Sequence, residues 1–128
     1  MSDQIQNKHY KNVERAPAEI GYLLQQLPAN LSSESDFTPD LLKKIEAVES
    51  HATNASFAVL CGLIAVGDML GTVMMEKESA RNISADTLSK LGFLINHLSV
   101  ELQFLHETES DMEFLRVEHA KKGGGDHA

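Results

Sequence analysis

"FAVLCGLIAVGDMLGTVMM", residues 57–75, is apolar almost throughout and as long as a membrane span, yet it carries one charge, Asp68. At about 100° per residue, Asp68 falls on a narrow polar line along the predicted helix. That line also contains Lys43, Ser50, Asn54, Cys61, Thr72 and Ser79. The pattern predicts that Asp68 faces water and that most of the remaining circumference is buried in a helical bundle. A transmembrane helix is disfavoured, because a central Asp costs about 3 kcal/mol on insertion.

Capping signals set the bounds of this helix. Thr38 is a good N-cap and Pro39 suits the first helical position. The next break is predicted near residues 79–84, where Ser84 can cap a second long helix that runs to about Lys122. Two long helices joined by a short connection favour an antiparallel hairpin.

A shorter helix precedes the hairpin. Four residues in "PAEIGYLLQQLP" form an apolar stripe at helical spacing, and Pro28 ends it. These residues are Ile20, Leu23, Leu24 and Leu27. We therefore predict an all-α protein with a flexible N-terminal arm over 1–16, a single helical domain over 17–122 and a flexible tail over 123–128.

Composition restricts the possible partners. The formal net charge is −8, which disfavours nucleic acid, because phosphate contacts need Lys and Arg. A partner with a basic or apolar surface is favoured instead. Cys61 is the only cysteine, so no disulfide within the chain and no cysteine-based zinc site is expected. The polar start "MSDQIQNKHYK" does not resemble a secretory signal, and we expect a cytoplasmic protein.

The last helix carries two apolar stripes. The first recurs every three or four residues and should pack on the central helix. It comprises Leu88, Leu91, Ile95, Leu98, Leu102, Leu105 and Met112. The second, Phe93, His97, Val100 and Phe104, lies roughly opposite and needs another neighbour. That neighbour is the short helix, a second copy or a foreign partner. A homodimer would make a four-helix bundle and cover the broad apolar surface of the central helix.

Glycines interrupt the central helix at Gly62, Gly67 and Gly71. Each costs about 1 kcal/mol in a helix interior. Close approach of a neighbouring helix would offset that cost. The alternative is a mildly flexible helix midpoint.

Catalytic patterns are lacking in the sequence. His97 and Glu101 have a spacing that can hold a metal, but neither the Glu-x-x-His pattern nor HExxH occurs. His97, among Phe and Val, is more typical of a packed core or interface histidine. There is no phosphate loop, no GxSxG and no dinucleotide fingerprint. Cys61 is expected to be a buried small hydrophobe. We predict no enzyme, no metal and no cofactor.

Four carboxylates lie within seven residues near the C-terminus: Glu107, Glu109, Asp111 and Glu113. They wrap around the helix and repel one another along it. They form either a solvated helix end or a patch that steers a basic protein surface.

The segments "SFAVLCGLIAVGDMLG" and "LSKLGFLINHLSVEL" resemble those of short, uncharacterised helical-hairpin proteins of proteobacteria and their phages. The likeness covers under half of the chain and contains no invariant polar motif. Small acidic helical proteins of this kind include quorum-sensing anti-activators, anti-CRISPR proteins and immunity proteins. By this analogy of shape, the resemblance implies a role in binding another protein.

The leading functional prediction is a non-catalytic protein that binds and regulates or inhibits another protein. Its binding residues are Phe93, His97, Val100 and Phe104 as an apolar patch, with Glu107, Glu109, Asp111 and Glu113 as electrostatic steering. The alternative is a small-molecule sensor or carrier, with a pocket lined by Phe57, Met69, Met74 and Met75.

Overall fold

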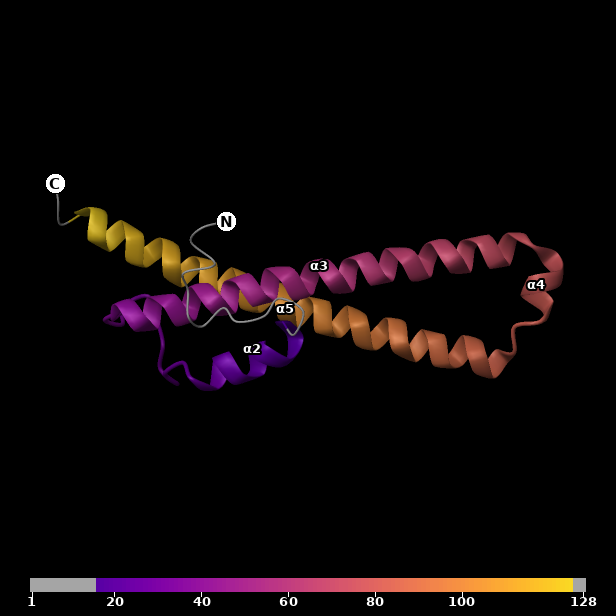
Figure 1. Cartoon of the computed structure of the whole chain (residues 1–128), viewed down its shortest axis with the longest axis horizontal. Coiled ribbons are helices and arrows are strands. Elements are labelled where there is room, and N and C mark those ends of the chain that lie inside the picture. The colour runs from indigo at the N-terminus through magenta and orange to yellow at the C-terminus, as the bar shows by residue number, and fades with distance from the viewer. Residues whose placement is uncertain (1–15, 126–128) are drawn as a thin grey trace. The chain divides into compact units, whose positions relative to one another are not determined.

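The computed structural model of the chain describes residues 16–125, and these form four helices (Figure 1). The helices are α2 (Ala16–Gln25), α3 (Pro39–Met75), α4 (Lys77–Arg81) and α5 (Ala85–Gly125). This part of the chain contains no strand, which confirms the all-α prediction. The predicted N-terminal arm lies almost entirely outside the described residues, as do residues 126–128.

The chain divides into two compact units. The described part of unit 1 comprises residues 16–55 and 105–125, and unit 2 comprises residues 56–104. Both α3 and α5 therefore contribute one part to each unit, whereas α2 belongs to unit 1 and α4 to unit 2.

Unit 1 has a closed apolar core. Its members come from α2, the first part of α3 and the last part of α5, and they include Leu23, Ile45, Val48, Met112 and Leu115. Burial of a large aliphatic side chain stabilises the folded state by about 1.5–3 kcal/mol. The predicted stripe of the short helix supplies part of this core, because Leu23 belongs to it and Leu24 and Leu27 pack against it.

A bidentate ion pair joins α3 to α5 inside unit 1. Arg116 Nε donates to Glu49 Oε2 at 2.8 Å, and Nη2 donates to Oε1 at 3.0 Å. These hydrogen bonds to Glu49 raise the pKa of Arg116 above its ordinary value, and the charges of Glu49, Glu113 and Glu46 act in the same direction. The rings of Phe37 and His119 add a second contact, with centroids 5.1 Å apart.

Both predicted N-caps are confirmed. The amide of Leu41 donates to Thr38 Oγ1 at 3.1 Å, and the amide of Thr87 donates to Ser84 Oγ at 3.1 Å. The other ends differ from the sequence prediction. α3 ends at Met75, ahead of the short α4, and α5 continues through Gly125, beyond the predicted end at Lys122.

Unit 2 is built on one seam between two helices. Half-buried side chains recur every three or four residues on both helices, which is the spacing of paired helices. They are Val59, Leu63, Val66, Leu70 and Val73 on α3, and Leu91, Ile95, Leu98 and Leu102 on α5. The predicted first stripe of the last helix thus packs as expected over these residues, while Leu88 is exposed.

Candidate binding surfaces

Unit 2 exposes most of the apolar surface of the described chain. Of the fourteen large hydrophobic side chains that are exposed, eleven belong to unit 2. Met75 is 88% exposed, Phe93 73% and Phe57 69%. The prediction that residues 57–75 are buried around most of the helix is therefore wrong for the isolated chain. A pair of helices buries only the face along which the two helices meet. The other faces of an apolar helix are covered only when further neighbours pack against them.

The second stripe of α5 lies on this exposed surface. Phe93 is 73% exposed, Val100 60% and Phe104 48%, and the His97 side chain is 75% exposed. His97 Nε2 lies 3.6 Å from Glu101 Oε2, one turn along the helix. The structure therefore brings the four predicted residues together on one face, and it excludes a packed core histidine. The core-facing side chains of α2 pack within unit 1.

The four predicted carboxylates lie on the part of α5 in unit 1, and they do not form a single patch. Glu109 is half-buried with an oxygen 4.0 Å from His106 Nδ1, and the charge of Glu113 acts on Arg116. Asp111 borders a groove that faces α2. Some of these carboxylates therefore interact with neighbouring side chains of the chain, and Asp111 lies at the exposed edge of the groove. The reason is their spacing, because residues two apart point to different sides of a helix.

The part of the polar line around Asp68 faces solvent, as predicted, whereas Ser50 and Asn54 on the same line are half-buried. Asp68 and Thr72 are exposed, and Thr72 Oγ1 donates to the carbonyl of Asp68 at 3.0 Å. Cys61 lies on the same line and is also exposed, so the prediction of a buried cysteine is wrong. The physical reason is its helical position, which is opposite the seam with α5.

The glycines of α3 border open space. A Cβ atom built on Gly62, Gly67 or Gly71 would meet no heavy atom within 4 Å. The close helix approach that could offset the cost of these residues is therefore not made within residues 16–125.

The methionines predicted to line a ligand pocket are on the surface. Met69 is 70% exposed, Met74 54% and Met75 88%, and Phe57 is similarly open. Side chains with this much exposure do not enclose a cavity. Met69 instead borders a shallow hollow on α3 with Asp68, Thr72 and Val73.

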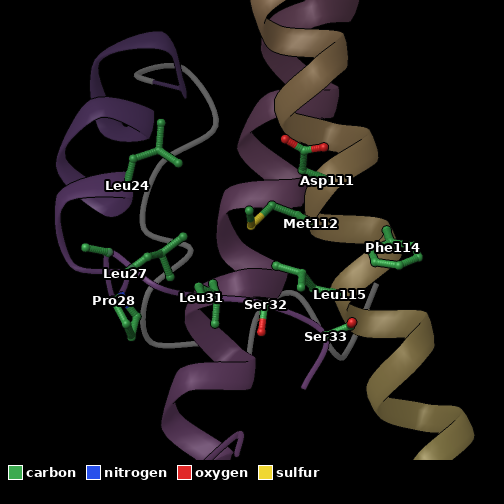
Figure 2. A pocket seen from close by; sticks show the side chains of 11 residues that line it. Leu24, Leu27, Pro28, Leu31, Ser32, Ser33, Asp111, Met112, Phe114 and Leu115 are labelled. Atoms are coloured by element: carbon green, nitrogen blue, oxygen red, sulfur yellow. The ribbon is translucent and has the colours of Figure 1, made fainter. Parts of the chain in front are cut away.

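A larger groove lies in unit 1, where the sequence did not predict one (Figure 2). It has a volume of about 530 Å³ and is lined by α2, by the linker that follows it and by one face of α5. The apolar lining comprises Leu24, Leu27, Pro28, Ala29, Leu31, Met112, Phe114 and Leu115, and the polar lining comprises Ser32, Ser33 and Asp111. The sequence signal was the apolar stripe of the short helix, because Leu24, Leu27 and the following Pro28 all line the groove.

Metal and membrane features are few. Among residues 16–125, no group of three or more His, Cys, Asp or Glu side chains is arranged to hold a metal ion. Within the same residues, α3 is the one helix long and apolar enough to cross a membrane by length and composition. Its apolar window is not buried inside the chain. Length and composition alone do not separate a membrane span from a helix that awaits a protein neighbour.

No protein-family model, curated protein or solved structure matches this chain. The resemblance to helical-hairpin proteins of proteobacteria and their phages stays a prediction.

Proposed function

We propose that this chain is a non-catalytic, cytoplasmic binding protein that associates with a second copy through α3 and captures another protein through the second stripe of α5. The observation that carries the proposal is the concentration of exposed large apolar side chains in unit 2. Monomeric soluble proteins rarely expose apolar patches of this extent unless they serve association.

The second copy accounts for the α3 side of unit 2. Phe57, Leu60 and Ile64 are exposed there, and Gly67 and Gly71 on the same face leave room for a neighbouring backbone. Small residues at such positions allow close helix approach. Two unit 2 hairpins together form a four-helix bundle. A stable interface buries about 800 Å² per partner. One aromatic side chain alone supplies about 150–250 Å² on full burial.

A foreign partner accounts for the second stripe of α5. Aromatic residues are enriched among the few positions that dominate binding energy, and Phe93 is the more exposed of the two phenylalanines in this stripe. The net charge of −8 favours a partner with a basic rim around an apolar site. Binding of this kind regulates or inhibits the partner by occupying its surface.

The partner-binding role is tested by photo-crosslinking in the source cell. We would replace Phe93 with p-benzoylphenylalanine and compare it with the same replacement at Val117, which is less exposed and lies in unit 1. The proposal predicts one discrete heterologous adduct from position 93 that disappears when Val100→Asp is added. Equal adducts from both positions, or adducts insensitive to Val100→Asp, would contradict a specific site.

The dimer is tested separately with the single native cysteine. A spin label on Cys61, which is exposed on α3, gives a dipolar signal only when two copies associate. The proposal predicts a defined inter-label distance that is lost in Ile64→Asp. A protein that floats with liposomes and shows no dipolar signal in buffer would instead favour the membrane interpretation.

A further inference from the structure

We infer that the groove of unit 1 binds a small amphiphile with an apolar chain and one ammonium group. Its volume of about 530 Å³ is within the range of small-molecule sites, about 300–1,000 Å³. Most of its lining is apolar, with Leu24 and Leu27 on one side and Met112 and Leu115 on the other. Figure 2 shows the side chains of Leu24, Leu27, Met112 and Leu115 on the walls between α2 and α5.

The charge at the edge of the groove favours a cationic ligand. Among the described residues that line the groove, Asp111 is the only charged one, and none of them is Lys, Arg or His. Its carboxylate lies beside Met112 at the upper edge of the groove in Figure 2. A cation placed at this edge gains a charge-assisted contact while its chain lies along the leucines. An anionic amphiphile of the same length would meet repulsion at that edge.

The linker wall is held by its own hydrogen bonds. The amide of Leu31 donates to the carbonyl of Pro28 at 3.2 Å, and the amide of Ser35 donates to the carbonyl of Ser32 at 3.0 Å. Lys122 Nζ donates to the carbonyl of Ser33, which connects the linker to α5. A wall fixed in this way lowers the ordering cost of binding.

The experiment uses the full chain with ¹³C-labelled methionine methyl groups. Met112 lines the groove, whereas Met69, Met74 and Met75 lie on the exposed surface of unit 2 and report non-specific adsorption. Decylammonium, decanoate and decanol, each below its micellar concentration, are titrated in parallel. We expect a saturable shift of the Met112 methyl with decylammonium, a weaker response with decanol and the weakest with decanoate.

Two pairs of variants localise the effect. Ala29→Trp places a large ring in the groove and should abolish the Met112 shift, while Asn30→Trp, at an exposed neighbouring position outside the lining, should not. Asp111→Asn should weaken decylammonium binding by about threefold to fivefold, in the range of an exposed ion contact. Asp36→Asn, at an exposed carboxylate that does not line the groove, should leave binding unchanged.

Three results would overturn this inference. The first is a Met112 shift of the same size with decanoate as with decylammonium. The second is a Met112 shift that survives Ala29→Trp. The third is a Met112 signal that changes with protein concentration and not with the probe, because it would assign the groove to a second copy of the chain. None of these results bears on the association of unit 2, which is measured at Cys61.

Discussion

Units 1 and 2 are built from the same two helices, yet they differ in what those helices bury. In unit 1, α2 lies over the first part of α3 and the last part of α5, and Ile45 and Val48 are fully buried. In unit 2, the two helices share one seam, and Ile64 on α3 is 56% exposed. A pair of helices closes one face of each member, so a third neighbour decides whether the rest is covered. Unit 1 has that neighbour in its own sequence, and we propose that unit 2 obtains it from another molecule.

The largest expected effect comes from the same substitution in the two units. Ile45→Ala removes a fully buried side chain and should lower the free energy of unfolding by about 2–5 kcal/mol. Ile64→Ala should change the free energy of unfolding of the dilute protein by no more than about 0.5 kcal/mol, because the Ile64 side chain is exposed. Urea denaturation followed by circular dichroism measures both. Equal losses at low protein concentration would mean that unit 2 has a core of its own.

A smaller effect is expected from a comparison of the α3 side of unit 2 with its α5 side. Gly67→Ala on α3 and Gly92→Ala on α5 should each stabilise the isolated helix by about 1 kcal/mol, because the added Cβ meets nothing within 4 Å. At concentrations where two copies associate, Gly67→Ala should weaken the dimer and Gly92→Ala should not. Concentration-dependent thermal melts distinguish these outcomes. A dimer stabilised equally by both changes would exclude close approach at Gly67.

The smallest effect compares ion pairs. The Glu49–Arg116 pair of unit 1 is bidentate and partly buried, so a double-mutant cycle with Glu49→Gln and Arg116→Gln should give a coupling of about 1 kcal/mol. The Asp86–Lys90 pair of unit 2 is about three-quarters exposed on both sides. Its cycle should give only about 0.3 kcal/mol. If the coupling energy of the Asp86–Lys90 pair were as large as that of the Glu49–Arg116 pair, unit 2 would have to shield the Asp86–Lys90 pair from water.

Much of the local structure could be predicted from the sequence. The caps at Thr38 and Ser84 follow from hydroxyl groups placed just before apolar periodic segments. The seam of unit 2 follows from apolar residues at steps of three and four. The end of α3 at Met75 was missed, because a polar stretch of good helix formers gives no proline or glycine signal there.

Burial was harder to predict than helicity. Residues 57–75 are apolar on nearly every face, and sequence pattern cannot say whether such faces are covered within the chain or by another molecule. The burial of His51 was also not predicted from the sequence. This residue lies four positions from both Ala47 and Ala55, on the buried face of α3. The groove beside Asp111 depends on the path of the linker, and periodicity does not determine that path.

The central claim is that unit 2 completes its apolar core with a second copy, and the solution mass tests it most directly. Size-exclusion chromatography with light scattering should give twice the 14.1 kDa of the chain for the native protein. Phe57→Asp combined with Ile64→Asp should return the mass to that of one chain without loss of helical circular dichroism, because both side chains are exposed in the isolated chain. A native protein that stays at 14.1 kDa across all concentrations in plain buffer would contradict the account.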